Sequence, residues 1–254
     1  MILLDFKMQG CSYIFYMNEI PVFNMSAGHN IKSQLPVSEW VLKGENVFKI
    51  KINPLPGHES YEEESPCTVN IVNKDAEEDK ILGTAVIPVL TELNNSPIKN
   101  DIIYSVKFNF NSSIREHYWG NGLEITNTKE AKLKLIEISN YFIGCFQKND
   151  IKSIIELLKV REQELAYYYN ENYLSRIARL TESFQQKMGN GNLKFEPINI
   201  ENTVMEYYLN NKIVCLKNIN YASAIIGYNN DIPITVFYPF YFCLNPSREF
   251  VIIK

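Results

Sequence analysis

The chain has 254 residues, of which 46% are hydrophobic and 21% are charged, and its net charge at pH 7 is −4. This length and composition are typical of a globular protein with one large domain or two ordinary ones. No apolar run reaches the roughly eighteen residues of a membrane-spanning helix, and the first residues lack the features of a signal peptide. We therefore expect a cytoplasmic protein that does not bind a membrane.

The charge is distributed unevenly along the chain. Residues 1–126 contain 10 Lys and Arg against 16 Asp and Glu, a difference of −6, and residues 127–254 contain 15 against 13, a difference of +2. Affinity for a phosphate backbone comes from clustered lysines and arginines, which this chain lacks. Nucleic acid is therefore excluded as an expected partner.

The first half of the chain consists of short β-forming runs separated by turn residues. Cys11–Met17 and Val22–Met25 flank a turn at Asn18–Pro21, which predicts a hairpin. Val47–Ile52 alternates apolar residues with lysines, as a half-buried strand does. Residues 1–126 are thus predicted to form an antiparallel β-sandwich. The further strands expected in it are Cys67–Val72, Leu82–Leu90, Ile102–Phe110 and Gly122–Ile125.

One part of this region has a family resemblance. The hairpin turn, the apolar stretch around Trp40, the corner Lys43–Asn46 and the alternating strand follow one another within residues 10–53. This order resembles the jelly-roll and galactose-binding-like β-sandwiches that are often appended to bacterial proteins. The resemblance implies a sandwich fold for this half.

The middle of the chain is predicted to be helical, because no proline occurs between Pro97 and Pro197. Asn127, with Glu130 three residues later, predicts a helix N-cap. The glycines and asparagines of Gly189–Asn192 predict the end of the helical region. We expect helices over 129–187 in three pieces: the first with an apolar stripe of Ala131, Leu135, Ile138, Phe142 and Phe146, the second at Ile151–Leu158, and the third at Arg161–Gln186.

The end of the chain returns to strands joined by asparagine-rich turns, which favours an antiparallel meander over 194–254. Residues 127–254 are therefore predicted to form an α+β domain, and the whole chain an α+β protein of two domains. The expected strands are Thr203–Leu209, Lys212–Leu216, Tyr221–Tyr228, Ile232–Leu244 and Phe250–Ile253.

The order of helices followed by a sheet also has a family resemblance. Leu135–Leu158, Thr235–Phe242 and Phe250–Lys254 carry it, and it covers about residues 130–254. The pattern resembles the NTF2-like, or cystatin-like cone, superfamily; a plain α+β domain is the alternative. The resemblance implies a pocket lined by the closing strands, with an Asp or His as general base in the catalytic members.

The sequence contains few candidates for catalysis. The three histidines, His29, His58 and His117, lie in the first half, and the acidic candidates on the closing strands are Glu206 and Asp231. No hydrolase, zinc-protease or P-loop motif occurs. The five cysteines are scattered without C-x-x-C spacing, so we expect buried, reduced thiols. We predict no catalytic residues, no cofactor and no metal site.

Two features favour binding of another protein. Two acidic loops flank the strand Cys67–Val72, and they lack the ligand order of a calcium loop. Three consecutive tyrosines, Tyr167–Tyr169, span about 200° of a helix, so at least one must point away from the core. The predicted partner-binding residues are Glu62, Glu63, Glu64, Glu77, Glu78, Asp79, Tyr167 and Tyr168.

The sequence therefore predicts a non-enzymatic bacterial protein-binding protein. The most specific version of this prediction is an immunity or antitoxin-like protein whose acidic loops neutralise a cationic toxin or effector. The alternative is an NTF2-like small-molecule-binding protein or enzyme. A further alternative is a carbohydrate-binding module in which an exposed Trp40 or Trp119 stacks on a sugar.

Overall fold

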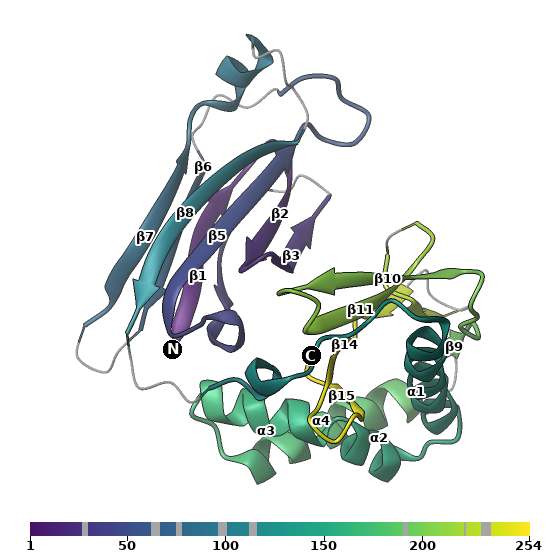
Figure 1. Ribbon diagram of the computed structural model, residues 1–254. Helices are drawn as coiled ribbons and strands as arrows, with labels where there is room; N and C mark the ends of the chain where they lie inside the picture. The colour runs from purple at the N-terminus through teal and green to yellow at the C-terminus, as the bar shows by residue number, and fades with distance from the viewer. Residues whose placement is uncertain are drawn as a thin grey trace. The chain divides into compact units, whose positions relative to one another are not determined.

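The computed structural model describes residues 1–26, 30–61, 67–74, 78–95, 101–111, 116–189, 193–220, 222–229 and 235–254. The chain is a mixed α+β protein whose strands form four antiparallel sheets, which confirms the coarse fold class (Figure 1). Contacts divide it into two compact units, Met1–Glu116 and His117–Lys254. Residues 117–126 thus belong with the second unit, although the sequence changes character at Thr126. Independent folding of two domains stays a prediction.

The first unit contains two four-stranded sheets, with the orders β4-β1-β6-β7 and β3-β2-β5-β8. Short 3-10 helices lie at Ser38–Trp40 and Leu90–Asn95. The strands are β1 (Ile2–Met8), β2 (Ser12–Met17), β3 (Ile20–Met25), β4 (Ile31–Pro36), β5 (Gly44–Asn53), β6 (Cys67–Asn73), β7 (Lys80–Ile87) and β8 (Ile102–Phe110).

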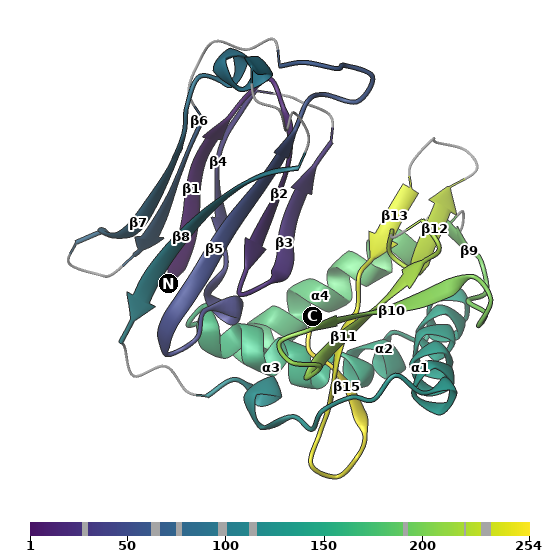
Figure 2. The ribbon, with the colours of Figure 1, turned by 45° about the horizontal axis from the view of Figure 1, so that its top comes forward.

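The two sheets pack through aromatic rings. The ring of Phe6, on β1, lies 5.0 Å from Phe15 on β2 and 5.8 Å from Phe23 on β3. At the β7–β8 edge, a Cβ added to Gly83 would lie 2.8 Å from the Val106 side chain, so β7 approaches β8 closely there. Figure 2 shows the strands of both sheets running alongside one another. This arrangement is the face-to-face packing expected of a sandwich.

The β2–β3 hairpin forms where the sequence predicts it, with Asn18 and Glu19 both at positive φ. Such angles suit the two-residue turns that match strand twist. The Asn18 side chain donates to the backbone O of Trp40 and to Oδ1 of Asn46, which is itself fully buried. Asn46 also accepts from the amide of Leu42. These buried amides fix the turn against the start of β5.

The second unit places helices along one face of two sheets, which have the orders β10-β11-β14-β15 and β13-β12-β9 (Figures 1 and 2). Phe142, Phe146 and Phe184 from the helices share one core with Phe195, Val214 and Phe242 from the strands. A 3-10 helix lies at Tyr118–Asn121. The elements are α1 (Lys129–Gln147), α2 (Ile151–Leu157), α3 (Lys159–Tyr168), α4 (Tyr173–Gly189), β9 (Leu193–Phe195), β10 (Thr203–Tyr208), β11 (Ile213–Asn218), β12 (Ile225–Asn229), β13 (Thr235–Tyr238), β14 (Tyr241–Leu244) and β15 (Phe250–Ile252).

Two helix predictions are corrected. The predicted third helix, Arg161–Gln186, is two helices, because Asn170 has a left-handed φ of 50° and Asn172 Oδ1 accepts from the amide of Ser175 at the start of α4. The N-cap of α1 is Thr128, whose hydroxyl accepts from the amide of Ala131, and not Asn127. Helix α4 ends at Gly189, as predicted.

The closing strands do not form the predicted meander. Strand β11 pairs with β14, while β12 pairs with β13 and β9. The expected strand Ile232–Leu244 is interrupted after Tyr238, because Pro239 cannot donate a ladder hydrogen bond. Gly122–Ile125 is not a strand and makes only an isolated bridge from Leu123 to Leu244. Three strands that the sequence analysis did not identify are β1, β4 and β9.

Candidate ligand-binding pocket

The acidic loops lie mostly outside the described residues, which exclude Glu62, Glu63, Glu64 and Glu77. Glu78 and Asp79 are described and exposed. Asp79 Oδ2 lies 3.4 Å from Lys74 Nζ, so part of its charge is balanced within the chain. With Glu59, which is also described and exposed, the described part of these loops carries three carboxylates, and that of Asp79 is paired.

The predicted tyrosines separate into one exposed and one buried ring. Tyr167 is 44% exposed, whereas Tyr168 is 8% exposed. Tyr168 stacks on His117 at 4.6 Å, and His117 stacks on Trp119 at the same distance. Tyr168 thus contributes to the packing of the second unit, and Tyr167 keeps a face available to a partner.

The expectation that an exposed Trp40 or Trp119 stacks on a sugar is wrong. Trp40 and Trp119 are 2% and 6% exposed, so neither presents a flat ring on which a sugar could stack. Of the acidic candidates on the closing strands, Glu206 lies 3.8 Å from Lys217 at the surface, and Asp231 lies outside the described residues. Neither observation identifies a general base.

A pocket of about 260 Å³ lies between the helices and the segment that joins β13 to β14. Helix α1 contributes Phe142 to it, and α4 contributes several residues from successive turns. Strand β13, the segment after it and Lys254 supply the remaining wall. We call it the aromatic pocket; its lining residues are Phe142, Leu158, Arg161, Leu180, Ser183, Phe184, Lys187, Phe237, Tyr238, Pro239, Phe240 and Lys254.

Local chain geometry places Tyr238 in this wall. Ser223 Oγ donates to the backbone O of Tyr238 at 2.9 Å, which holds the end of β13. The Tyr238 ring centroid lies 5.3 Å from that of Phe142 and 6.0 Å from that of Phe195. The strand break at Pro239 then allows Phe240 to face Phe142, with ring centroids 4.8 Å apart.

The Tyr238 hydroxyl is the unusual atom of the aromatic pocket. It is buried and has no hydrogen-bond partner among the described residues. Burial raises the pKa of Tyr238 to about 12, so the hydroxyl stays protonated at physiological pH. Buried polar groups nearly always have a hydrogen-bond partner, so this hydroxyl is the exception in the pocket wall.

The cations of the pocket differ in their surroundings. Arg161 forms an ion pair with Glu162, and Glu162, which is buried, also accepts from Arg176 Nε at 2.6 Å. Lys187 lies at the mouth, with Nζ 5.6 Å from the Tyr238 ring centroid and 5.9 Å from that of Phe184. Its ammonium therefore rests over two ring faces.

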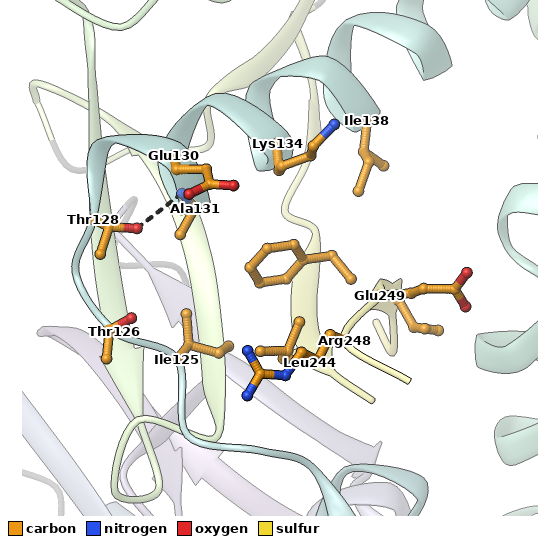
Figure 3. Close-up of a pocket in the computed structure, with 12 residues that line it drawn as sticks. Ile125, Thr126, Thr128, Glu130, Ala131, Lys134, Ile138, Leu244, Arg248 and Glu249 are labelled. Atoms are coloured by element: carbon orange, nitrogen blue, oxygen red, sulfur yellow. Dashed lines mark hydrogen bonds between the residues drawn. The ribbon is translucent and has the colours of Figure 1, made fainter. Parts of the chain in front are cut away.

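A second, wider hollow of about 620 Å³ lies between the start of α1 and the β14–β15 hairpin (Figure 3). Its lining is about half polar and includes the charged residues Glu130, Lys134, Arg248 and Glu249. Arg248 has a left-handed φ of 63° and points toward Ile125, whereas Glu249 points the other way (Figure 3). Because these charges are of both signs, this groove favours no class of ligand.

The sequence analysis placed Phe142 on the apolar stripe of the first helix and overlooked Lys187. The sequence does contain a local indication for Lys187. It follows Phe184 by three residues, a spacing that places both side chains on one face of the helix. The approach of Tyr238 to that face depends on the sheet arrangement.

The chain matches no family model, no curated protein and no solved structure. None of the helices in the described residues is long and apolar enough to cross a membrane. Within the same residues, no three His, Cys, Asp or Glu side chains are grouped to hold a metal ion. The aromatic pocket is therefore the candidate site with the clearest chemistry.

Proposed function

We propose that the second unit binds a small organic molecule in the aromatic pocket. The observation that carries this proposal is a cavity of about 260 Å³ that is walled mostly by aromatic and apolar side chains and has few polar residues, Ser183 and Lys187 among them. Ligand pockets combine mostly apolar walls with a few placed polar groups, and this pocket has that composition. Its position against the closing strands favours the small-molecule-binding alternative of the NTF2-like resemblance.

The size of the pocket limits the ligand. Its volume of about 260 Å³ lies just below the range of roughly 300–1,000 Å³ that is typical of ligand sites. A compound with one ring, or a short acyl chain, is therefore the size to expect. Such a ligand would pack against the rings of Phe142 and Phe240, which line the pocket.

A panel of single-ring and short-chain compounds should identify ligands that raise the melting temperature of the full chain. Ser183 lines the pocket, so Ser183→Phe should fill it and abolish the shift. Gln185→Phe adds the same ring to an exposed position of the same helix and should keep the shift. Equal binding by both variants would place the ligand elsewhere, and the absence of any ligand across the panel would contradict the proposal.

A second candidate function is binding of another protein, in the manner of an immunity or antitoxin-like protein of bacterial type. The exposed ring of Tyr167 favours it, as does the acidic excess of residues 1–126, which suits a cationic partner. A partner would first be captured from the native cell. Tyr167→Ala should then weaken the complex, whereas Tyr141→Ala, which removes an equally exposed ring from α1, should not. Equal effects of the two variants would contradict this role for Tyr167.

A further inference from the structure

The charged side chains that line the aromatic pocket are Arg161, Lys187 and Lys254, and no Asp or Glu side chain lines it. Arg161 is paired with Glu162, so Lys187 is the cation whose charge matters most to a ligand. Charge complementarity therefore favours a ligand with a negative group and disfavours an amine, which would be repelled at the mouth.

Lys187 is the cation best placed to meet such a group. Other lysines of the second unit are engaged by the chain itself: Lys134 with Glu137, Lys159 with Glu156, and Lys212 with the backbone O of Gly120. Lys187 has no carboxylate or carbonyl partner among the described residues and makes only its contacts over two rings. Its three ammonium hydrogens therefore remain available at the pocket mouth.

We infer that the ligand is a small apolar monocarboxylate, bound with its carboxylate at Lys187, and this inference rests on the proposed binding function. Its apolar part, a ring or a short acyl chain, lies against Phe142, Phe184 and Phe240. A charge-assisted contact to Lys187 would add to the apolar burial and select the acid over its neutral analogues.

Two matched pairs of probes test this inference on the full chain: phenylacetate with phenylacetamide, and hexanoate with hexanol. Within each pair the apolar part is similar and the charge differs. We expect at least one acid to bind roughly tenfold more tightly than its neutral partner by calorimetry, because a charge-assisted hydrogen bond contributes about that ratio.

Lys187→Gln should weaken binding of the acid by roughly tenfold and leave the neutral partner unchanged. Lys152→Gln, on the exposed side of α2, is the control and should change neither. Because Lys187 is exposed, its substitution should not unfold the chain, and the melting temperature of the free variant checks this.

The outcomes separate the two proposals. Equal binding of acid and neutral partner, or an acid affinity that survives Lys187→Gln, would overturn the inference and leave small-molecule binding intact. Failure of both acids and both neutral partners to bind would overturn the inference, and failure of the wider panel as well would overturn the proposed function.

Discussion

Removing the hydroxyl of Tyr238 should stabilise the free protein, which is the opposite of the usual effect of Tyr→Phe in a packed site. A buried polar group without a partner costs about 1–3 kcal/mol, and the Tyr238 hydroxyl has none among the described residues. The ring itself packs against Phe142 and Phe195. Tyr238→Phe keeps these contacts, so we expect the free energy of unfolding of the second unit to rise by about 1 kcal/mol.

The measurement is denaturant unfolding of the full chain in a Trp40→Phe background. Trp119 is then the single tryptophan, and its fluorescence reports the second unit alone. Tyr207→Phe is the matched control, because the Tyr207 hydroxyl donates to Met205 Sδ at 3.5 Å and its loss should be neutral or slightly destabilising. A loss of more than about 1 kcal/mol in Tyr238→Phe would show that this hydroxyl is hydrogen-bonded in the free protein and would refute the reasoning.

Three further predictions concern the units and their titratable groups. A fragment of residues 117–254 should show cooperative thermal unfolding by circular dichroism, whereas a fragment of residues 127–254 should not. Only the longer fragment keeps the buried side chains of His117, Trp119 and Ile125. Similar melting curves of the two fragments would contradict this prediction. The cysteines should resist alkylation until the chain unfolds, since all five are buried and burial raises the pKa of the Cys215 and Cys243 thiols to about 12. Rapid alkylation of the native protein, detected by mass spectrometry, would disprove this prediction. The free energy of unfolding should fall as the pH rises from about 9 to 12. The reason is that the folded chain keeps protons on these thiols and on Tyr238 that the unfolded chain loses. Denaturant titrations that give the same free energy across this pH range would argue against this prediction.

Local patterns in the sequence predicted the elements whose structure is decided locally. The stripe from Ala131 to Phe146 predicted α1, and the alternation in Val47–Ile52 predicted β5. The hairpin at Asn18 follows from residues that accept a left-handed backbone. The break after Tyr168 was missed because four tyrosines nearby continue an apolar helical pattern, while the interruption depends on Asn170 and on the cap at Asn172.

Strand pairing could not be predicted in the same way. Consecutive strands with short turns favour a meander, and β11 does pair with β10 on one edge. Its other edge, however, skips β12 and β13 and pairs with β14. The turn after β11 returns the chain through a bridge from Lys217 to Ser223, and Ser223 then anchors Tyr238 in the other sheet. Strand β1 was missed because its core face is fully apolar and Leu3 on its outer face is also buried, so alternation is weak.

The candidate pocket shows why overall charge was a poor guide to the site. The sequence analysis sought function in the acidic loops, since carboxylates predominate in residues 1–126. In the described structure the aromatic pocket is lined by three basic residues, Arg161, Lys187 and Lys254. They come from α3, α4 and the last residue of the chain, and Arg161 and Lys254 are ninety-three positions apart. The counts for the second half nearly cancel, so composition hides this excess. Lys187 becomes a candidate ligand contact because the pairing of β13 with β12 places Tyr238 beside α4, where the Lys187 ammonium lies over its ring. This contact combines a helix pattern with a strand pairing, and no single stretch of sequence contains both.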